Sequence, residues 1–218
     1  TNGARLNDAA MRLPGVATED DLETVLMTDP SIVSVATPTD THAAVVESLA
    51  NDIDVRAIIC EKPMARFVAD AEAMVRVCRA AGIRLFVNHS RRFDHEFLAL
   101  AKYLLAWSSG QPMWATLFYS GGLWNNGPHA VDLIRMLTGW SIERVLAWHG
   151  PGGPVAGDRA ASFTFWPDYG VGGGTCVHLD ADPWSRFSLR LDGTTGAVEV
   201  DGYEITRWDA APHRHFTG

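Results

Sequence analysis

The sequence predicts an α/β domain with a parallel sheet, followed by an α+β domain with an open, mostly antiparallel sheet. In the first part of the chain, three short aliphatic runs alternate with helical patterns, an order that requires parallel strands joined by right-handed crossovers. From Ile142 onward, short strand-like runs follow one another directly. The pattern changes after Arg92, which predicts two domains, residues 1–93 and residues 94–218.

The first domain begins with a stretch that reads as irregular, residues 1–15. Thr18 reads as the N-cap of a helix that continues to Met27. Continuous aliphatic and β-branched runs then predict strands buried on both faces, and amphipathic runs between them predict the crossover helices. The expected strands are residues 31–37, 55–60 and 83–88, and the expected helices are residues 40–51 and 68–82.

The second domain combines two expected helices with a series of strands. Phe187, Leu189 and Leu191 alternate with other residues, which is typical of an antiparallel strand with one wetter face. We expect one face of this sheet, including Phe163, Phe165 and Trp166, to meet a partner subunit. The expected helices are residues 95–107 and 128–139, and the expected strands are residues 113–120, 142–150, 159–166, 171–179, 185–191, 196–200 and 203–208.

The composition excludes several classes of protein. The formal net charge is -8, with 26 acidic and 18 basic residues, which argues against a nucleic-acid-binding surface. No apolar run approaches the ~20 residues that a membrane span needs, and the N-terminus carries no signal-peptide pattern. Cys60, Cys78 and Cys176 lie far apart, which favours buried thiols over disulfides or a metal cluster. We therefore expect a cytoplasmic protein that binds neither nucleic acid, membrane nor metal.

Polar, conformationally restricted residues follow each of the three parallel strands, where α/β proteins bind their ligands. The strands end in "ATPTDTH", "CEKPM" and "NHSRRF". Pro38 and Pro63 each hold the preceding residue in an extended conformation, so Lys62 should project from the strand edge. The alternative is that Lys62 is an ordinary surface lysine at the start of a loop.

A second polar cluster occurs in the second domain, in "GGLWNNGPHAVDLIRMLTG". Asn125 and Asn126 precede Gly127, His129 begins a helix, and Asp132 follows one turn later. The positive end of the helix dipole favours a neutral imidazole, the form that a general base requires. The alternative is that His129 is a helix-terminal residue hydrogen-bonded to Asp132.

These motifs, in this order, resemble the glucose-fructose oxidoreductase / inositol dehydrogenase / MocA family of NAD(P)-dependent oxidoreductases. The resemblance covers roughly residues 18 to 208 and includes "DRAASFTFWPDYGVGGGTC" and "LDGTTGAVEV". It implies a Rossmann-type sheet, NAD or NADP as cofactor, and a sugar, polyol or related hydroxy or keto compound as substrate. From the apolar residues of the C-terminal sheet we separately expect a homo-oligomer formed through that sheet.

The resemblance implies roles for individual residues. Lys62 takes the place of the lysine that reaches substrate and nicotinamide, with a lowered pKa and a Lys-Pro peptide that is often cis. His129 matches the acid/base histidine, and Asn125 stands where an aspartate is usual. An amide there can orient the imidazole or a substrate hydroxyl, but it cannot stabilise an imidazolium by charge. The positions implied to bind the cofactor are Thr37, Pro38, His42, Glu61, Lys62, Pro63 and Arg91.

No G-x-G-x-x-G fingerprint occurs in these 218 residues, because "GVGGGT" at 170–175 lies in a strand-rich region. The family carries its fingerprint in the first βαβ unit, so we expect a segment of ~30 residues or more before Thr1, or its loss. Two alternatives to a dehydrogenase stay open. One is a non-catalytic binding or assembly protein that keeps the fold, and the other is a lyase or glycosidase that uses NAD transiently.

Overall fold

A computed structural model describes residues 3–51, 55–107, 113–149, 158, 160–168, 172–179 and 186–209. The chain divides into two compact units, Thr1–Asn88 and His89–Gly218. The dividing point lies shortly before residue 93, where the sequence predicts a domain boundary. Within the described ranges, no helix has both the length and the apolar character that crossing a membrane would require.

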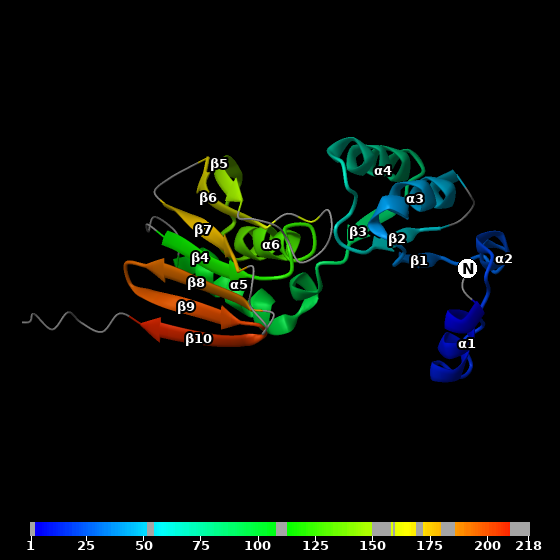
Figure 1. Cartoon of the computed structure of the whole chain (residues 1–218), viewed down its shortest axis with the longest axis horizontal. Helices are drawn as coiled ribbons and strands as arrows, with labels where there is room; N and C mark the ends of the chain where they lie inside the picture. The colour runs from blue at the N-terminus through cyan, green and yellow to red at the C-terminus, as the bar shows by residue number, and fades with distance from the viewer. Residues whose placement is uncertain are drawn as a thin grey trace, which may run out of the picture. The chain divides into compact units, whose positions relative to one another are not determined.

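The first unit is built on a parallel sheet of three strands, as predicted. These are β1 (Ile32–Val35), β2 (Ala57–Cys60) and β3 (Arg84–Val87), hydrogen-bonded in that order. Helices α3 (His42–Asn51) and α4 (Val68–Ala80) lie on one side of the sheet (Figure 1). The core between these layers is aliphatic, with two of the cysteines, and includes Val35, Val46, Leu49, Ile58, Cys60, Met74 and Cys78.

Two predictions for the N-terminal part of this unit are wrong. Residues 1–15 do not form an irregular stretch, because Gly3–Arg12 forms helix α1. An ion pair one turn apart joins Arg12 to Asp8 at 3.0 Å, and the helix has no buried residue. The ion pair is a local interaction that supports the helix, and no residue of the helix packs in a core. A short 3-10 helix, η1 (Thr39–Thr41), precedes α3.

Thr18 is not a helix N-cap. Helix α2 (Leu22–Leu26) begins later, and Asp21 caps it by accepting a 2.9 Å hydrogen bond from the Thr24 backbone N–H. A carboxylate is an effective N-cap because it accepts a hydrogen bond from an otherwise unpaired backbone N–H. Its negative charge also interacts favourably with the partial positive charge at the N-terminus of the helix. The same contacts lower the pKa of Asp21.

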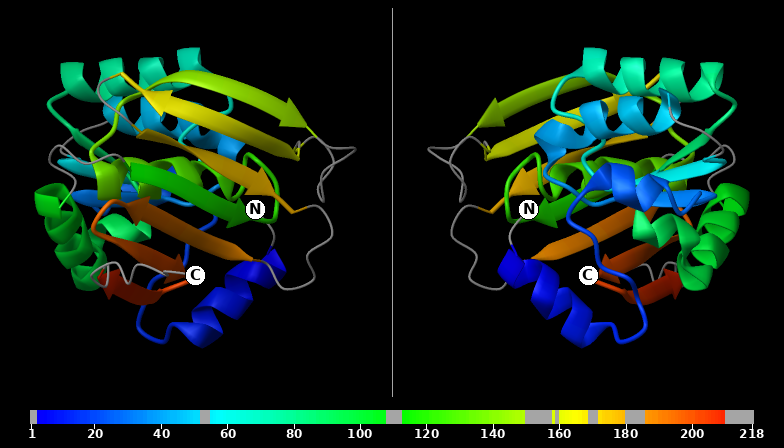
Figure 2. Two further views of the ribbon diagram at one scale, coloured as in Figure 1. Left: turned by 90° about the vertical axis from the view of Figure 1, so that its left-hand side faces the viewer. Right: turned by 90° about the vertical axis from the view of Figure 1, so that its right-hand side faces the viewer.

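The second unit contains a seven-stranded sheet in the order β10-β9-β8-β4-β7-β6-β5 (Figure 2). The β4–β7 pair is parallel and the other pairs between the described strands are antiparallel, so the prediction of an open, mostly antiparallel sheet is confirmed. The strands are β4 (Met113–Tyr119), β5 (Ile142–His149), β6 (Ala161–Pro167), β7 (Gly172–His178), β8 (Phe187–Gly193), β9 (Gly196–Asp201) and β10 (Glu204–Asp209).

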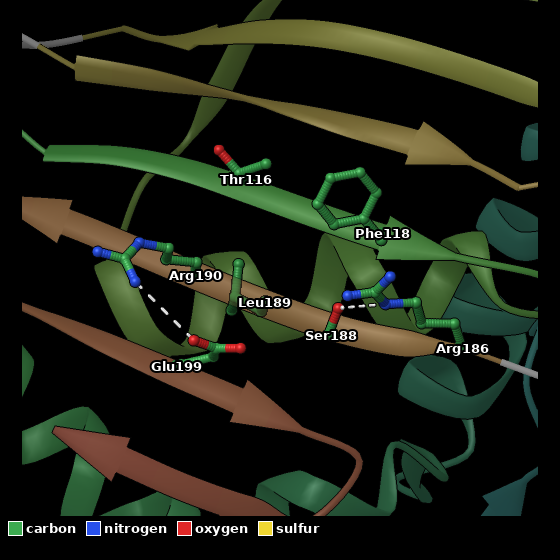
Figure 3. A pocket seen from close by; sticks show the side chains of 7 residues that line it. All are labelled: Thr116, Phe118, Arg186, Ser188, Leu189, Arg190 and Glu199. Atoms are coloured by element: carbon green, nitrogen blue, oxygen red, sulfur yellow. Dashed lines mark hydrogen bonds and ion pairs between the residues drawn. The ribbon is translucent and has the colours of Figure 1, made fainter.

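Helices α5 (His95–Trp107) and α6 (Gly127–Thr138) pack on one face of this sheet, and η2 (Ser90–Phe93) precedes α5. Phe163 and Phe165 are buried in the core beneath these helices, so the expectation that they face a partner subunit is wrong. Alternation along β6 explains the error, since every second side chain points toward the helices. Thr116, Phe118 and Arg190 instead project from the opposite face (Figure 3).

Candidate active site

The three parallel strands bring their polar C-terminal segments to one edge of the first sheet. Thr37 follows β1, Glu61 follows β2 and Asn88 follows β3. Backbone hydrogen bonds continue the ladder into these segments, because the Glu61 N–H donates to Val35 O and the Asn88 N–H donates to Cys60 O. The candidate ligand-binding residues of this unit therefore lie on a rigid edge.

His42 ties two of these segments together. Its ring is buried, with Nε2 at 2.8 Å from the Thr37 carbonyl oxygen and Nδ1 at 3.2 Å from the Met64 carbonyl oxygen. Both ring nitrogens are thus directed at backbone carbonyls of the protein. These contacts favour a structural role for His42 over the direct cofactor contact that the resemblance implies.

Thr37 and Pro38 form the exposed part of the first segment. The Thr41 hydroxyl lies 2.7 Å from the Pro38 carbonyl oxygen and 2.8 Å from the Thr37 hydroxyl. Contacts between its own residues therefore stabilise the turn after β1. The exposed surfaces of Thr37 and Pro38 remain accessible to a ligand.

Lys62 follows β2 and is partly buried. The Lys62–Pro63 peptide is cis, as the resemblance implies. Glu61 accepts a 2.6 Å hydrogen bond from the Asn88 side-chain amide and a 3.3 Å hydrogen bond from the Lys62 backbone N–H. Burial lowers the pKa of Lys62, and the neighbouring Glu61 carboxylate opposes that shift. The direction agrees with the expectation for a lysine that acts in a crevice.

In the second unit, His129 lies in the first turn of α6. It lies beside His89, a histidine to which the sequence motifs assign no role. The rings of His89 and His129 meet edge to face, with centroids 5.8 Å apart and planes at 87°. His89 Nδ1 also lies 3.7 Å from a carboxylate oxygen of Asp132. Arg92 Nε donates to both oxygens of Asp132, at 2.8 and 3.0 Å. Two imidazoles, a carboxylate and a guanidinium therefore form one cluster.

Asn125 lies in the loop between β4 and α6, and its side chain is exposed. The neighbouring Asn126 amide donates to Ser120 O at 2.6 Å, and the Gly122 N–H donates to His178 Nε2 at 3.1 Å. A carboxylate from outside the loop, Asp158, accepts hydrogen bonds from the loop backbone. Motif spacing could not identify His178 or Asp158, because both lie far along the chain from the loop.

Arg91 is held inside the second unit. Its guanidinium lies 4.5 Å from the Phe187 ring centroid, 4.9 Å from that of Tyr203 and 5.8 Å from that of Phe97. One terminal nitrogen donates to Gly202 O at 3.3 Å, and burial lowers the pKa of Arg91. This aromatic enclosure favours a structural role over the cofactor contact that the resemblance implies.

The chemistry of the two units differs. The first presents a partly buried lysine with a lowered pKa beside cis-Pro63, a group suited to stabilising an oxyanion. The second presents His129 and His89, which are suited to proton transfer. Lys62 belongs to the first unit and His129 to the second.

Comparisons with known proteins agree with this fold. Residues 2–89 match the model of an oxidoreductase family with an NAD-binding Rossmann fold. The chain is 31% identical over 199 residues to D-apiose dehydrogenase of Paraburkholderia graminis, covering 84% of this chain and 51% of that protein. It is 30% identical over 138 residues to myo-inositol 2-dehydrogenase of Thermotoga maritima, covering 56% and 41%. The chain thus spans about half the length of the curated relatives that it matches.

A solved structure supports the same architecture. The WlbA dehydrogenase of Bordetella pertussis, in complex with NADH and UDP-GlcNAcA, matches with a TM-score of 0.80 at 23% identity. The match covers 98% of this chain and 68% of that one. At this identity the likeness establishes the fold, which includes both the parallel sheet and the second, mixed sheet.

Proposed function

Since the chain belongs to the glucose-fructose oxidoreductase / inositol dehydrogenase / MocA family of oxidoreductases, we propose that the intact protein is an NAD(P)-dependent oxidoreductase. It transfers hydride between the nicotinamide and a sugar, a polyol or a related hydroxy or keto compound. The observation that carries the proposal is the strand edge, where Lys62 is partly buried, has a lowered pKa and follows Glu61, which accepts a hydrogen bond from the Asn88 amide. A match to the family covers the residues that form this edge.

The residues of this edge fit a nicotinamide cofactor. Thr37 and Pro38 are exposed after β1, and Glu61, Lys62 and Pro63 are partly exposed after β2. An edge of this kind is where doubly wound sheets take dinucleotides. The cofactor would supply the hydride acceptor or donor when bound, and these residues would hold it.

Three side chains are proposed to serve the reaction. Lys62 stabilises the negative charge that develops on the substrate oxygen as its hydroxyl becomes a carbonyl. His129 accepts the hydroxyl proton, and the exposed amide of Asn125 orients the histidine or a substrate hydroxyl. For reduction of a keto compound, the same groups act in the reverse direction.

The test is turnover by the intact protein with NAD or NADP, measured by the absorbance of the reduced nicotinamide. The substrate panel contains D-apiose and myo-inositol, which the names of the relatives supply, and other aldoses and polyols. Net hydride transfer with any of them supports the proposal. Elimination or hydrolysis without net change in the nicotinamide identifies the lyase or glycosidase alternative. Ligand binding without turnover across the panel identifies the binding or assembly alternative.

A homo-oligomer formed through the second sheet is proposed as well. The support is the sheet face away from α5 and α6, where Phe118 lies beside Arg186 and Thr116 lies near Arg190 (Figure 3), and where Trp114 is 40% exposed. Exposed aromatic side chains and arginines are enriched in the interfaces that join subunits. Sedimentation at micromolar concentration should give an oligomer for the intact protein and a monomer for Phe118→Glu. A monomeric wild-type protein contradicts this assembly.

The cytoplasm is the proposed location. The support is that Cys60, Cys78 and Cys176 are buried free thiols, the state that a reducing compartment maintains. Fractionation of the source cells tests the assignment, and recovery of the protein outside the cytoplasm contradicts it.

A further inference from the structure

Asp158 lies outside the elements that carry the candidate site, yet its carboxylate binds the backbone of the site loop. Oδ1 accepts a 2.8 Å hydrogen bond from the Trp124 N–H, and Oδ2 accepts a 3.2 Å hydrogen bond from the Asn125 N–H. Each oxygen thus has its own donor. A carboxylate is the one side-chain group that offers two acceptor oxygens in this arrangement without also presenting a donor.

The loop is shaped to receive this carboxylate. Gly122 has φ +90, a conformation that favours glycine, and a Cβ at this position would lie 2.1 Å from Asp158 Oδ2. The carboxylate therefore rests directly on the glycine backbone. Gly122 is itself fixed, because its N–H donates to the buried His178.

The segment that Asp158 binds leads directly into the proposed catalytic residues. The Asn126 N–H donates to Gly122 O at 3.0 Å, and helix α6 begins at Gly127 with His129 in its first turn. The side chains of Trp124 and Asn125 are exposed, while their backbone N–H groups point to Asp158. The loop backbone beside Asn125 is thus bound by a residue that does not belong to the loop.

We propose that Asp158 is a positioning residue that fixes the backbone of residues 122–125 and so sets the place of Asn125 and His129. This role rests on the proposed function, because a positioned loop affects turnover only if the loop serves the reaction. Asp158 acts through the loop and exchanges no proton with the substrate.

The first measurement is amide hydrogen exchange of Trp124 and Asn125 in the intact protein, followed by NMR. In Asp158→Ala both amides lose their acceptor, so both should exchange about tenfold faster or more. In Asp158→Asn one oxygen is replaced by a donor, so one of the two amides should exchange faster while the other stays protected. The control is Asp168→Asn, an exposed residue, which should leave both amides unchanged.

The second measurement is steady-state kinetics of the same variants. Asp158→Ala should lower kcat about ten- to hundredfold, because small displacements of reacting groups are costly, with an unchanged KM for the nicotinamide. Asp158→Asn should fall between Asp158→Ala and the wild type, and Asp168→Asn should match the wild type. A role in stability alone predicts instead that kcat per folded molecule is unchanged.

The two measurements separate the two proposals. Unchanged exchange of both amides in Asp158→Ala overturns the inference, whatever the activity. Faster exchange with a wild-type kcat overturns the positioning role. If the wild-type protein transfers no hydride with any substrate, the proposed function fails, and the exchange data alone then decide whether Asp158 fixes the loop. If Asp158→Ala does not fold, Asp158→Asn decides. Faster exchange of one of the two amides in that variant supports the proposal, and unchanged exchange of both contradicts it.

Discussion

The side-chain amide of Asn88 donates a 2.6 Å hydrogen bond to Glu61, joining the ends of β3 and β2. The other carboxylate oxygen of Glu61 accepts from the Lys62 backbone N–H at 3.3 Å. Glu61 therefore acts on Lys62 in two ways, since it holds the lysine backbone and its charge raises the lysine pKa against the effect of burial.

Glu61→Gln is expected to lower the pKa of Lys62 further, because the opposing charge is lost while burial remains. The protonated lysine is the form proposed to stabilise an oxyanion, so activity should fall as pH rises through the pKa of Lys62. The alkaline limb of kcat/KM should therefore move to lower pH in this variant. Glu47→Gln, on the exposed face of α3, serves as the control and should leave the limb in place.

Lys62→Met removes the cation and keeps most of the stem volume, so the fold should survive. Loss of one charged group that stabilises the transition state typically costs ~10²–10³ in kcat. The measurement is kcat in the intact protein, with Lys102→Met, an exposed lysine on α5, as the matched control. A wild-type kcat for Lys62→Met means that the β2 strand end is not the site of the reaction.

His129→Ala should remove general-base assistance, which typically contributes ~10²–10⁴, and flatten the acidic limb of the pH–rate profile. Asn125→Asp then tests what the amide does. If Asn125 orients His129, the introduced charge should favour the imidazolium and move the acidic limb to higher pH. If Asn125 contacts the substrate, the change should appear in KM, with the limb unmoved. Retention of the wild-type rate by His129→Ala excludes the histidine as the base.

His42→Ala tests the connection between the β1 and β2 segments. The substitution leaves a cavity and removes the partners of the Thr37 and Met64 carbonyl oxygens. The free energy of unfolding should fall by about 2–4 kcal/mol, measured by urea denaturation. His95→Ala, at an exposed position, should change it by less than about 0.5 kcal/mol. Equal stabilities of the two variants contradict the structural role.

The sequence predicts those features that local pattern determines, and it misses those that tertiary contacts determine. The end of a strand shortly before Lys62 and the start of a helix shortly before His129 follow from aliphatic runs and helical spacing, and the structure contains both elements as β2 and α6. His89 lies in a quoted motif, but its neighbours Asp132 and His129 come from a helix that only folding brings to it. Asp158 begins a stretch quoted for the resemblance, but its contacts could not be predicted locally, because its partners are backbone N–H groups of another segment.

The resemblance implies a cofactor contact for Arg91, whereas its guanidinium lies among three aromatic rings, which favours a structural role. Arg91→Ala should lose these cation–π contacts and the hydrogen bond to Gly202 O, lowering the free energy of unfolding by about 2–4 kcal/mol. The KM for NAD or NADP should not change. Arg135→Ala, an exposed arginine in the last turn of α6, is the control and should cost less than about 1 kcal/mol. The opposite result, wild-type stability with a raised KM for the nicotinamide, would restore Arg91 to the cofactor-binding residues.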